Sequence, residues 1–517
     1  MKQQFLLFAA AALMAVGTAR ADDNVTFHWE AGIVANSGTE QLAPHHIAAE
    51  SLVTQQHGFQ VFAAVGHEMD TTARFSWSAN VRLMGGYTSN ADYLRWNDAT
   101  ASLMPKEQHP GRLLVEQLSA AVKYRCLFLL AGKDYRRSPL VDGSLSSGDL
   151  VMSGNVPLPA GARAGFIDYQ NVPFTNGWLQ IGGEVGYYKS DDSKWLENHY
   201  NQLNGFITTG YWLNYKWLHL RSNPSKPFVA TIGMQAACQF GGTQIMYTDG
   251  VETERVKMDA NAKAFFKALI PGSGGNANGD HYYEGNHVGS WDIRFDYRFH
   301  NGHSLAAYHQ HPWEDGSGIG FKNGFDGLWG LQYSNDKPNA PLGAVVVEYL
   351  DMTNHSGPLH FNPKDYTTDT RPDGSPIHGE ATGADNYYNN YAYSGYSYRG
   401  QALGSPMLVS PLFNQDGYIS FAHNVMRGFH FAATGHFAPQ WQWTFKGTWR
   451  KSWGNIFMPL ESPVASTSWL ARVGWQQSTC GGWRASLSLA LDRGKLTGDN
   501  FGALLSVSYH GNFSFNH

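Results

Sequence analysis

Residues 291–299 of this chain read WDIRFDYRF and show the clearest alternation of apolar and charged residues in the sequence. Large apolar side chains occupy the odd positions, and aspartate alternates with arginine on the even positions. Because successive side chains of a β-strand point to opposite faces, the segment predicts a strand with one apolar and one charged face. Charges are costly in a packed core but are solvated in a water-filled lumen, which favours the wall of a barrel. The predicted lumenal charges are Asp292, Arg294, Asp296 and Arg298, with Arg294 expected to pair with Asp292 or Asp296.

The same alternation recurs elsewhere in the chain. In residues 440–453, Trp441, Trp443 and Trp449 alternate with polar or charged residues, and residues 75–83 and 484–492 repeat the pattern. We count about eighteen such strands, an even number that suits a closed bacterial barrel. They are predicted at residues 25–35, 58–69, 74–86, 114–123, 126–134, 163–169, 178–188, 215–221, 228–240, 287–299, 303–311, 327–333, 342–353, 424–436, 440–453, 466–476, 482–492 and 501–515. The fold class that follows is all-β: a transmembrane antiparallel β-barrel of about 18 strands, which forms a single domain over residues 22–517.

Short and long connections alternate along the chain. Short turns are predicted at residues 70–73, 124–125, 301–302 and 438–439, and long loops at residues 135–162, 241–286 and 354–423. In such barrels the short turns face the periplasm and the long loops are extracellular. Two stretches in long connections, residues 40–56 and 251–270, carry apolar residues at helical spacing and are predicted to form short helices that plug or cap the barrel.

The composition excludes several classes of protein. Of 517 residues, 57 are Gly, 14% are aromatic and 15% are charged, and the net charge is −5. The chain lacks the basic stripe of a nucleic-acid-binding protein and is too aromatic for a disordered one. Residues 1–21 combine Lys2, an apolar run and Ala-Arg-Ala, which predicts a cleaved signal peptide and export.

The sequence offers no catalytic motif. It contains neither G-x-S-x-G nor H-E-x-x-H, so we predict that the protein is not an enzyme and needs no cofactor. Its three cysteines are too far apart for a disulfide framework or a zinc site. His309 and His311 share a strand face, but without an evident third ligand no metal site is predicted.

Residues 383–398, in the longest loop, read GADNYYNNYAYSGYSY. Tyrosine rings stack on the C–H faces of sugars, while Asn and Asp side chains form hydrogen bonds with sugar hydroxyls. The alternative is that these tyrosines only order the loop. A second polar and aromatic cluster follows His311 and is expected at the same rim. The candidate glycan-binding residues are Asp385, Tyr387, Tyr388, Asn389, Asn390, Tyr391, Trp313, Glu314 and Asp315.

Several short motifs follow one another in a fixed order. They are SSGDLVMSGN at 146–155, VPFTNGW at 172–178, EDGSG at 314–318 after Gln310, DGLWG at 326–330 after Asn323, EYL at 348–350, TNHSGP at 353–358 and DNYYNN at 385–390. With these motifs, the chain resembles the Wzi-type capsule-assembly proteins over about residues 29–453. It departs from them at residues 240–242, where it has Phe-Gly-Gly in place of Trp-Gly-Gly.

The resemblance implies an occluded barrel of the outer membrane that acts as a surface lectin. Such proteins bind newly exported capsular polysaccharide and promote capsule assembly and attachment at the cell surface. The implied partners are this polysaccharide, outer-membrane lipid and the polysaccharide-export machinery. A family member carries a helical bundle on the periplasmic side, whereas the alternation of connections places both predicted helices of this chain on the outer side.

Two other functions compete with the lectin. An 18-stranded barrel is wide enough for the aqueous channel of a porin, which the charges at 292–298 would line. Against that, the loops that begin at Tyr135 and Gly241 are long enough to fold inward and close the lumen. An outer-membrane hydrolase would need a nucleophile–base set that the sequence does not show.

Overall fold

The computed structural model describes residues 24–38, 41–50, 56–108, 113–270, 273–275, 281–283, 285–314, 316–356, 362–372, 374–380, 385–477 and 482–514. The predicted signal peptide at residues 1–21, Asp315 and Cys480 lie outside these described residues. None of the helices in the described ranges is long and apolar enough to cross a bilayer.

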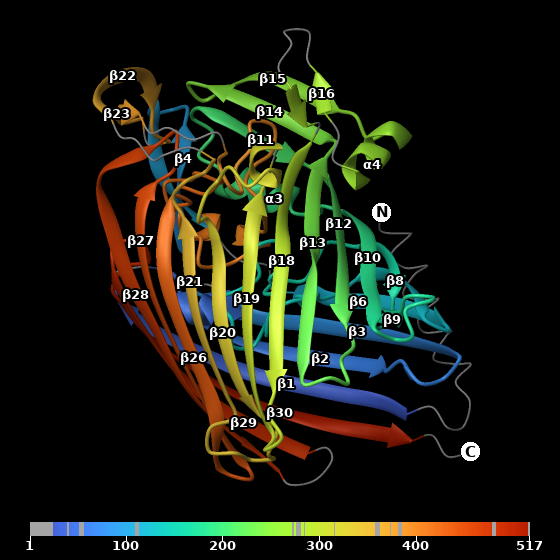
Figure 1. Ribbon diagram of the computed structural model, residues 1–517. Coiled ribbons are helices and arrows are strands. Elements are labelled where there is room, and N and C mark those ends of the chain that lie inside the picture. The colour runs from blue at the N-terminus through green and yellow to red at the C-terminus, as the bar shows by residue number, and fades with distance from the viewer. Residues whose placement is uncertain are drawn as a thin grey trace.

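The main sheet of the structure is a closed antiparallel barrel (Figure 1). Each wall strand pairs with the next one along the chain, and β30 (Asn500–Ser514) returns to pair with β1 (Asn24–Gly38) over the full length of both. Of the 19 strands in this sheet, β8 and β9 share one position beside β10, so the described wall has eighteen positions. All of the predicted strands overlap wall strands, which confirms the all-β, antiparallel barrel of about 18 strands.

The wall strands between β1 and β30 follow the chain. They are β2 (His57–His67), β3 (Phe75–Thr88), β6 (Leu113–Tyr124), β7 (Leu127–Lys133), β8 (Gly161–Phe166), β9 (Gln170–Asn171), β10 (Leu179–Lys189), β12 (Trp212–Ser222), β13 (Phe228–Phe240), β18 (Asn286–Arg298), β19 (His303–Trp313), β20 (Gly327–Asn335), β21 (Ala344–Met352), β26 (Met426–Ala438), β27 (Trp441–Gly454), β28 (Pro459–Gln476) and β29 (Gly482–Gly494).

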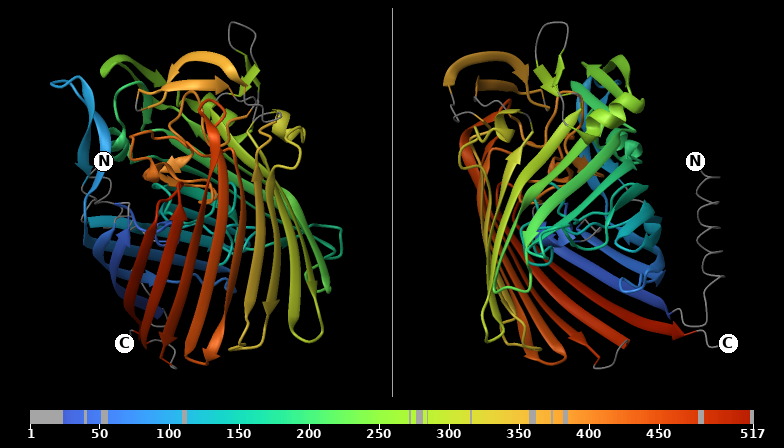
Figure 2. Two further views of the ribbon diagram at one scale, coloured as in Figure 1. Left: turned by 90° about the vertical axis from the view of Figure 1, so that its left-hand side faces the viewer. Right: turned by 45° about the vertical axis from the view of Figure 1, so that its right-hand side comes forward.

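Short turns gather at one end of the barrel and long connections at the other, as predicted (Figure 2). We call these the short-turn end and the long-loop end. The long connections carry hairpins, a small sheet and short helices: β4 (Ala91–Asn97), β5 (Ser102–Gln108), β11 (Gly205–Thr209), β14 (Gly242–Thr248), β15 (Val251–Met258), β16 (Ser273–Gly275), β17 (His281–Tyr283), β22 (Asn362–Thr370), β23 (Pro376–Glu380), β24 (Ser397–Tyr398), β25 (Gln401–Ala402), α2 (His45–Glu50), α3 (Ser193–His199), α4 (Ala262–Leu269), α5 (Gly316–Ile319) and η1 (Pro411–Phe413).

The two predicted helices lie in long connections, as expected, but their extents differ. The first is α2, which covers six residues of the predicted stretch. The second prediction is wrong for Val251–Met258, which is strand β15 and pairs with β14. Asp249 and Gly250 both have positive φ, 49° and 81°, and such a pair favours a tight hairpin turn. Helix α4 begins only after Asn261, whose side chain accepts a hydrogen bond from Ala264 N at 3.0 Å and caps the helix.

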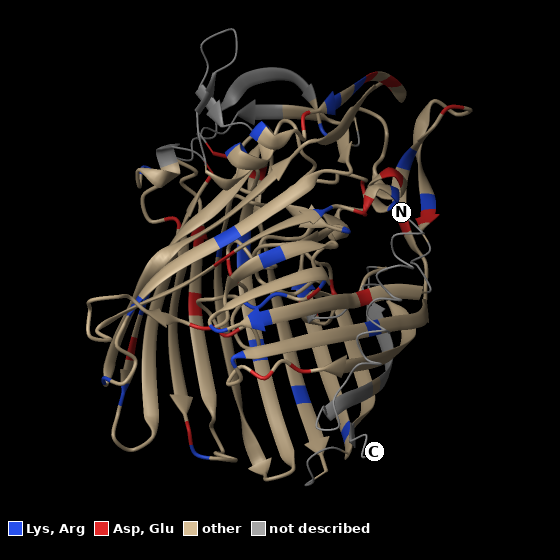
Figure 3. Cartoon of the chain, turned by 90° about the vertical axis from the view of Figure 1, so that its right-hand side faces the viewer, with Lys and Arg blue, Asp and Glu red and all other residues tan. Residues whose placement is uncertain are grey.

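The outward face of the wall carries aromatic side chains in register. Trp329 pairs with Tyr349, Tyr349 with Phe429, and Phe429 with Trp449, so four neighbouring strands present one aromatic row near the long-loop end. The rings of Tyr349 and Phe429 lie 4.8 Å apart. Figure 3 shows long stretches of the wall strands without any charged residue.

A second aromatic row lies nearer the short-turn end. Trp483 pairs with Tyr509, which pairs with Trp29. The ring centroid of Trp483 lies 5.5 Å from that of Tyr509 and 5.3 Å from that of Trp29. On β27, Trp441 lies near the short-turn end, and Trp449 belongs to the aromatic row near the long-loop end. Eight residues of strand separate them, which is about 26 Å along the strand.

Candidate functional site

The connection between β7 and β8, residues 134–160, folds into the lumen, and we call it the plug loop. Leu150 and Val151 of this loop are almost fully buried. They belong to the same buried cluster as Tyr215 of β12 and Tyr308 of β19, which are wall residues. The plug loop thus packs inside the barrel against several wall strands, as its length allows.

Buried polar groups of the wall bind the backbone and side chains of the plug loop. The carboxylate of Glu348, which is 1% exposed, accepts hydrogen bonds from Ser146 Oγ and Ser147 N, both at 2.6 Å. Gln310 Oε1 accepts from Leu150 N at 2.9 Å. Charge-assisted bonds of this kind are stronger than neutral ones, so Glu348 is an anchor of the plug.

Asp149 is the most heavily bonded acid of the plug loop. Four donors bind its carboxylate: Val151 N at 2.8 Å, Met152 N at 3.0 Å, Ser138 Oγ at 2.5 Å and Gln235 Nε2 at 2.8 Å. The amide nitrogen of Gln235 also donates to Asp292 at 2.8 Å and so bridges the plug to the wall. Burial, and next the nearby charge of Asp292, raise the pKa of Asp149.

Three of the predicted lumenal charges, Asp292, Arg294 and Asp296, are buried or half-buried inside the barrel. Asp292 is 1% exposed beneath the plug, and its carboxylate accepts from His219 Nε2 at 2.9 Å and from Gln235. Arg294 pairs with Asp296 at 2.9 Å, one of the two partners expected for it, and also donates to a plug-loop carbonyl, Leu140 O, at 3.0 Å. Asp292 is therefore bonded to wall residues and linked to the plug loop through Gln235, away from open water.

Arg298, the last residue of this row, has a different role. It is exposed at the short-turn end, where Nη2 donates to Lys226 O at 2.9 Å and to Pro224 O in the β12–β13 turn. The geometry indicates that Arg298 orders this turn.

Residues 385–425, part of a second long connection, form hydrogen bonds with the plug loop from the long-loop end. Tyr388 donates its hydroxyl proton to Leu150 O, and Tyr396 does the same to Val151 O at 2.8 Å. Asn389 Oδ1 accepts from Phe421 N at 2.8 Å, and Asn389 Nδ2 donates to Phe421 O at the same distance. The two loops therefore pack against each other inside the barrel.

Most of the candidate glycan-binding residues have protein partners within these packed loops. Asp385, Tyr387, Tyr388, Asn389 and Trp313 are buried, and Asn390 and Glu314 are half-buried. Glu314 accepts from Tyr388 N at 2.6 Å, and Tyr387 accepts from Asn323 Nδ2 at 2.6 Å. The ring of Tyr391, in contrast, is 66% exposed. The alternative interpretation, that the tyrosines order the loop, fits the buried ones, and Tyr391 stays a candidate for direct stacking.

Asp326 and His355 connect two loops just outside the wall strands. Asp326 accepts from the backbone nitrogens of Asn354 at 2.9 Å and His355 at 2.8 Å. The ring of His355 lies within 3.1 Å of Asp385 O and 3.0 Å of Met352 O. Burial raises the pKa of Asp326 to about 6 and lowers the pKa of His355 to about 4.

Replacing His355 by glutamine is expected to change how stability depends on pH. In the unfolded protein His355 regains its ordinary pKa and binds a proton, whereas in the folded protein it stays neutral. The free energy of unfolding therefore falls by about 3 kcal/mol as the pH falls from about 6.5 to 4. Asp326 acts in the opposite direction, since its raised pKa favours the folded state as pH falls through about 6. His355→Gln should therefore lose less stability than the parent between pH 7.5 and 4.5 in urea unfolding. Equal losses would contradict the buried, neutral state of His355.

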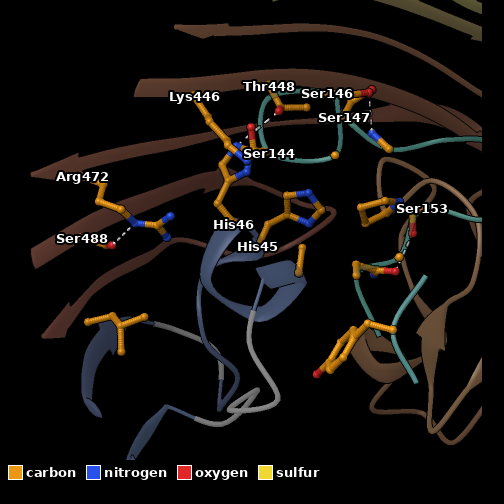
Figure 4. Close-up of a pocket in the computed structure, with 18 of the residues that line it drawn as sticks. His45, His46, Ser144, Ser146, Ser147, Ser153, Lys446, Thr448, Arg472 and Ser488 are labelled. Atoms are coloured by element: carbon orange, nitrogen blue, oxygen red, sulfur yellow. Dashed lines mark hydrogen bonds between the residues drawn. The ribbon is translucent and has the colours of Figure 1, made fainter. Parts of the chain in front are cut away.

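A polar cavity of about 680 Å³ lies in the lumen beside the plug loop (Figure 4). His45 and His46 of α2 point into it, together with serines of the plug loop and Arg472 and Lys446 of the wall. A second cavity of about 390 Å³ lies toward the short-turn end. The sequence interpretation missed this arrangement, because α2, the plug loop and β28 are far apart in the chain and polar residues on an inward strand face do not reveal what faces them.

His309 and His311, for which no metal site is predicted, lie beside aromatic rings. The two rings lie 5.8 Å apart, and His309 stacks on Trp329 at 3.7 Å. Among the residues placed by the structure, no group of three His, Cys, Asp or Glu residues is arranged to hold a metal ion.

Comparison with solved structures finds other large barrels of low sequence identity. Wzi of Escherichia coli, an outer membrane protein involved in group 1 capsule assembly and a carbohydrate-binding β-barrel, is 12% identical over 94% of this chain and 85% of that one, with a TM-score of 0.49. OccK5 (OpdH) of Pseudomonas aeruginosa is 8% identical over 95% and 98%, with a TM-score of 0.44. OccAB4 of Acinetobacter baumannii is 11% identical over 96% and 100%, with a TM-score of 0.43. Neither a family model nor a curated protein matches the chain. One fold serves many functions, so this likeness concerns the architecture alone.

Proposed function

We propose that the protein is a non-catalytic outer-membrane barrel that binds exported polysaccharide at its long-loop end. The observation that carries this proposal is that the plug loop and residues 385–425 lie inside the barrel and form hydrogen bonds with each other and with the wall. On this proposal the two loops close the lumen, so that the barrel presents a protein surface at its long-loop end, where a porin would present an opening. A long polymer can be retained on such a surface by many weak contacts.

The outward face of the wall supports a position in the outer membrane. The two aromatic rows resemble the girdles that flank the apolar band of membrane barrels, a band about 25 Å tall. Trp441 and Trp449 lie about 26 Å apart along the strand, which at a tilt of about 40° corresponds to about 20 Å of height and is close to that of the band. Between them on the same outward face lies Phe445, so the band is apolar at its middle.

The chemistry of the long-loop end suits a sugar polymer. The exposed ring of Tyr391 offers a stacking face, and the half-buried side chain of Asn390 lies beside it in sequence. The sequence resemblance to Wzi-type proteins supports capsular polysaccharide as the polymer and capsule attachment as the role. On this proposal the long-loop end faces the medium, the short-turn end faces the periplasm and its export machinery, and residues 1–21 are removed on export.

Replacing Tyr391 by alanine is expected to weaken binding of the host's own polysaccharide about fivefold to tenfold, because stacking of one aromatic ring on a sugar face contributes about 1 kcal/mol. The measurement is a binding assay on the purified protein in non-ionic detergent, repeated as polysaccharide retention on cells. Phe174→Ala is the matched control, since Phe174 is fully exposed in a turn at the short-turn end. Equal binding by both variants and the parent would remove Tyr391 from the site, and no binding by the parent would refute the proposed function.

A porin is the second candidate function, and the two lumenal cavities favour it. Together they form a polar space that reaches toward the short-turn end. Such a space conducts only if the plug loop moves aside. Conductance across a planar bilayer therefore separates the two functions.

A further inference from the structure

The two lumenal cavities adjoin each other on one side of the wall. Both are lined by Arg472, Ser486 and Ser506 of strands β28, β29 and β30. The smaller cavity is also lined by Pro439 and Gln440, which form the β26–β27 turn at the short-turn end. The polar space therefore runs from the plug loop down to the short-turn end, and we call it the vestibule.

The strand register arranges hydroxyls around two arginines in the vestibule. Arg472 pairs with Ser488 across the strands, and Arg472 Nε donates to Ser488 Oγ at 2.8 Å. Ser486 pairs with Ser506, and their hydroxyl oxygens lie 2.9 Å apart. Arg484 lies four residues from Ser488, which places it about 13 Å nearer the short-turn end. The wall thus offers a deep arginine among hydroxyls and a second arginine near the mouth.

The charges that line the vestibule are mostly positive. The basic residues are Arg82, Lys446, Arg472 and Arg484. Among the described residues that line the two cavities, Glu116 is the one carboxylate, and it already accepts from Arg82 Nε and from Tyr135 OH. A lumen with low-dielectric walls focuses the field of such charges. The vestibule therefore favours an anion.

Buried polar atoms with no protein partner also line the larger cavity. They are Gln60 Oε1, Ser147 Oγ and Asn155 Nδ2. Gln60 is 5% exposed and Ser147 is 6% exposed. Buried polar atoms normally have a partner, so these atoms call for water or ligand hydroxyls. A hydroxyl can both donate and accept, and it therefore satisfies either kind of atom.

We infer that the vestibule binds an acidic sugar. The carboxylate of the sugar lies at Arg472, its hydroxyls contact Ser486, Ser488 and Ser506, and Arg484 attracts the anion at the mouth. The smaller cavity, at about 390 Å³, is within the size range of small-molecule sites. This inference goes beyond the proposed function, because the site lies inside the barrel and away from Tyr391.

Calorimetry with the full-length protein in non-ionic detergent tests the inference. Glucuronate is the probe, glucose has a similar ring without the charge, and acetate has the charge without the ring. Glucuronate should bind about tenfold more tightly than either, because both the carboxylate and the hydroxyls are recognised. Glucose or acetate binding as tightly as glucuronate would overturn the inference.

Matched variants locate the site. Arg472→Gln should weaken glucuronate binding about tenfold, and Arg484→Gln about threefold with a weaker dependence on salt. Arg493→Gln, on β29 but at its long-loop end with a side chain 60% exposed, should bind like the parent. Heat modifiability on gels checks that each variant is folded. If Arg472→Gln does not fold, binding of glucuronate by Arg484→Gln and Arg472→Lys tests the site instead. Parent-like binding by the folded Arg472 and Arg484 variants would overturn the inference, whereas Tyr391→Ala should leave glucuronate binding unchanged whether or not the polysaccharide proposal holds.

Discussion

Replacing Phe445 by arginine is expected to lower the free energy of unfolding by about 2–4 kcal/mol, the cost of a charge at the middle of the lipid-facing wall. Phe445 lies four residues from Trp441 and four from Trp449, midway between the two aromatic rows. Its ring also packs near Trp469, with centroids 5.8 Å apart, and the substitution removes that contact as well. The measurement is urea unfolding in lipid vesicles.

Gln442→Arg is the matched control for Phe445→Arg. Gln442 lies on the same strand but lines the smaller lumenal cavity, where an added charge remains in water. Its cost is expected to stay within about 1 kcal/mol, in line with lumenal substitutions in membrane barrels. Equal losses for the two variants would show that the outward face of β27 does not contact lipid.

Replacing Asp149 by leucine is expected to lower the free energy of unfolding by about 3 kcal/mol, because four donors lose their acceptor. Relief of the repulsion with Asp292 offsets part of a larger loss. Asp149→Asn keeps a carbonyl oxygen for two of the four donors and should cost about 1 kcal/mol. Urea unfolding gives the energies, and limited proteolysis reports release of the plug loop.

Asp142→Leu is the control within the same loop. The side chain of Asp142 is partly exposed and accepts from Ser144 N at 2.9 Å, a local contact that does not reach the wall. The expected cost is about 1 kcal/mol or less. If Asp149→Leu costs no more than this control, the Asp149–Gln235–Asp292 bridge does not hold the plug.

The wall of the barrel could be predicted from the sequence because its signal is local. Alternation with a period of two, as at residues 291–299, is set by the geometry of a single strand and needs no knowledge of its neighbours. The alternation of short and long connections then fixed the two ends. The error at Val251–Met258 arose because apolar residues at helical spacing also occur by chance, and the Asp249–Gly250 turn was the stronger local signal.

The inward fold of the plug loop could be predicted from the sequence only from the length of this connection. Loop length allowed residues 134–160 to fold inward, but the contacts that hold them there join distant parts of the chain. Tyr388 and Leu150 are 238 residues apart, and Gln235 and Asp149 are 86 apart. For the same reason the tyrosine-rich stretch did not reveal which rings are buried and which, like Tyr391, are exposed.

The proposed function requires a closed lumen and a binding surface at the long-loop end. The most direct test is the conductance of the purified parent protein in planar bilayers. A variant in which residues 143–155 are replaced by a short Gly-Ser linker shows that an opened barrel is detected. We expect no stable open channel for the parent and open channels for the variant. Stable open channels in the parent would contradict it.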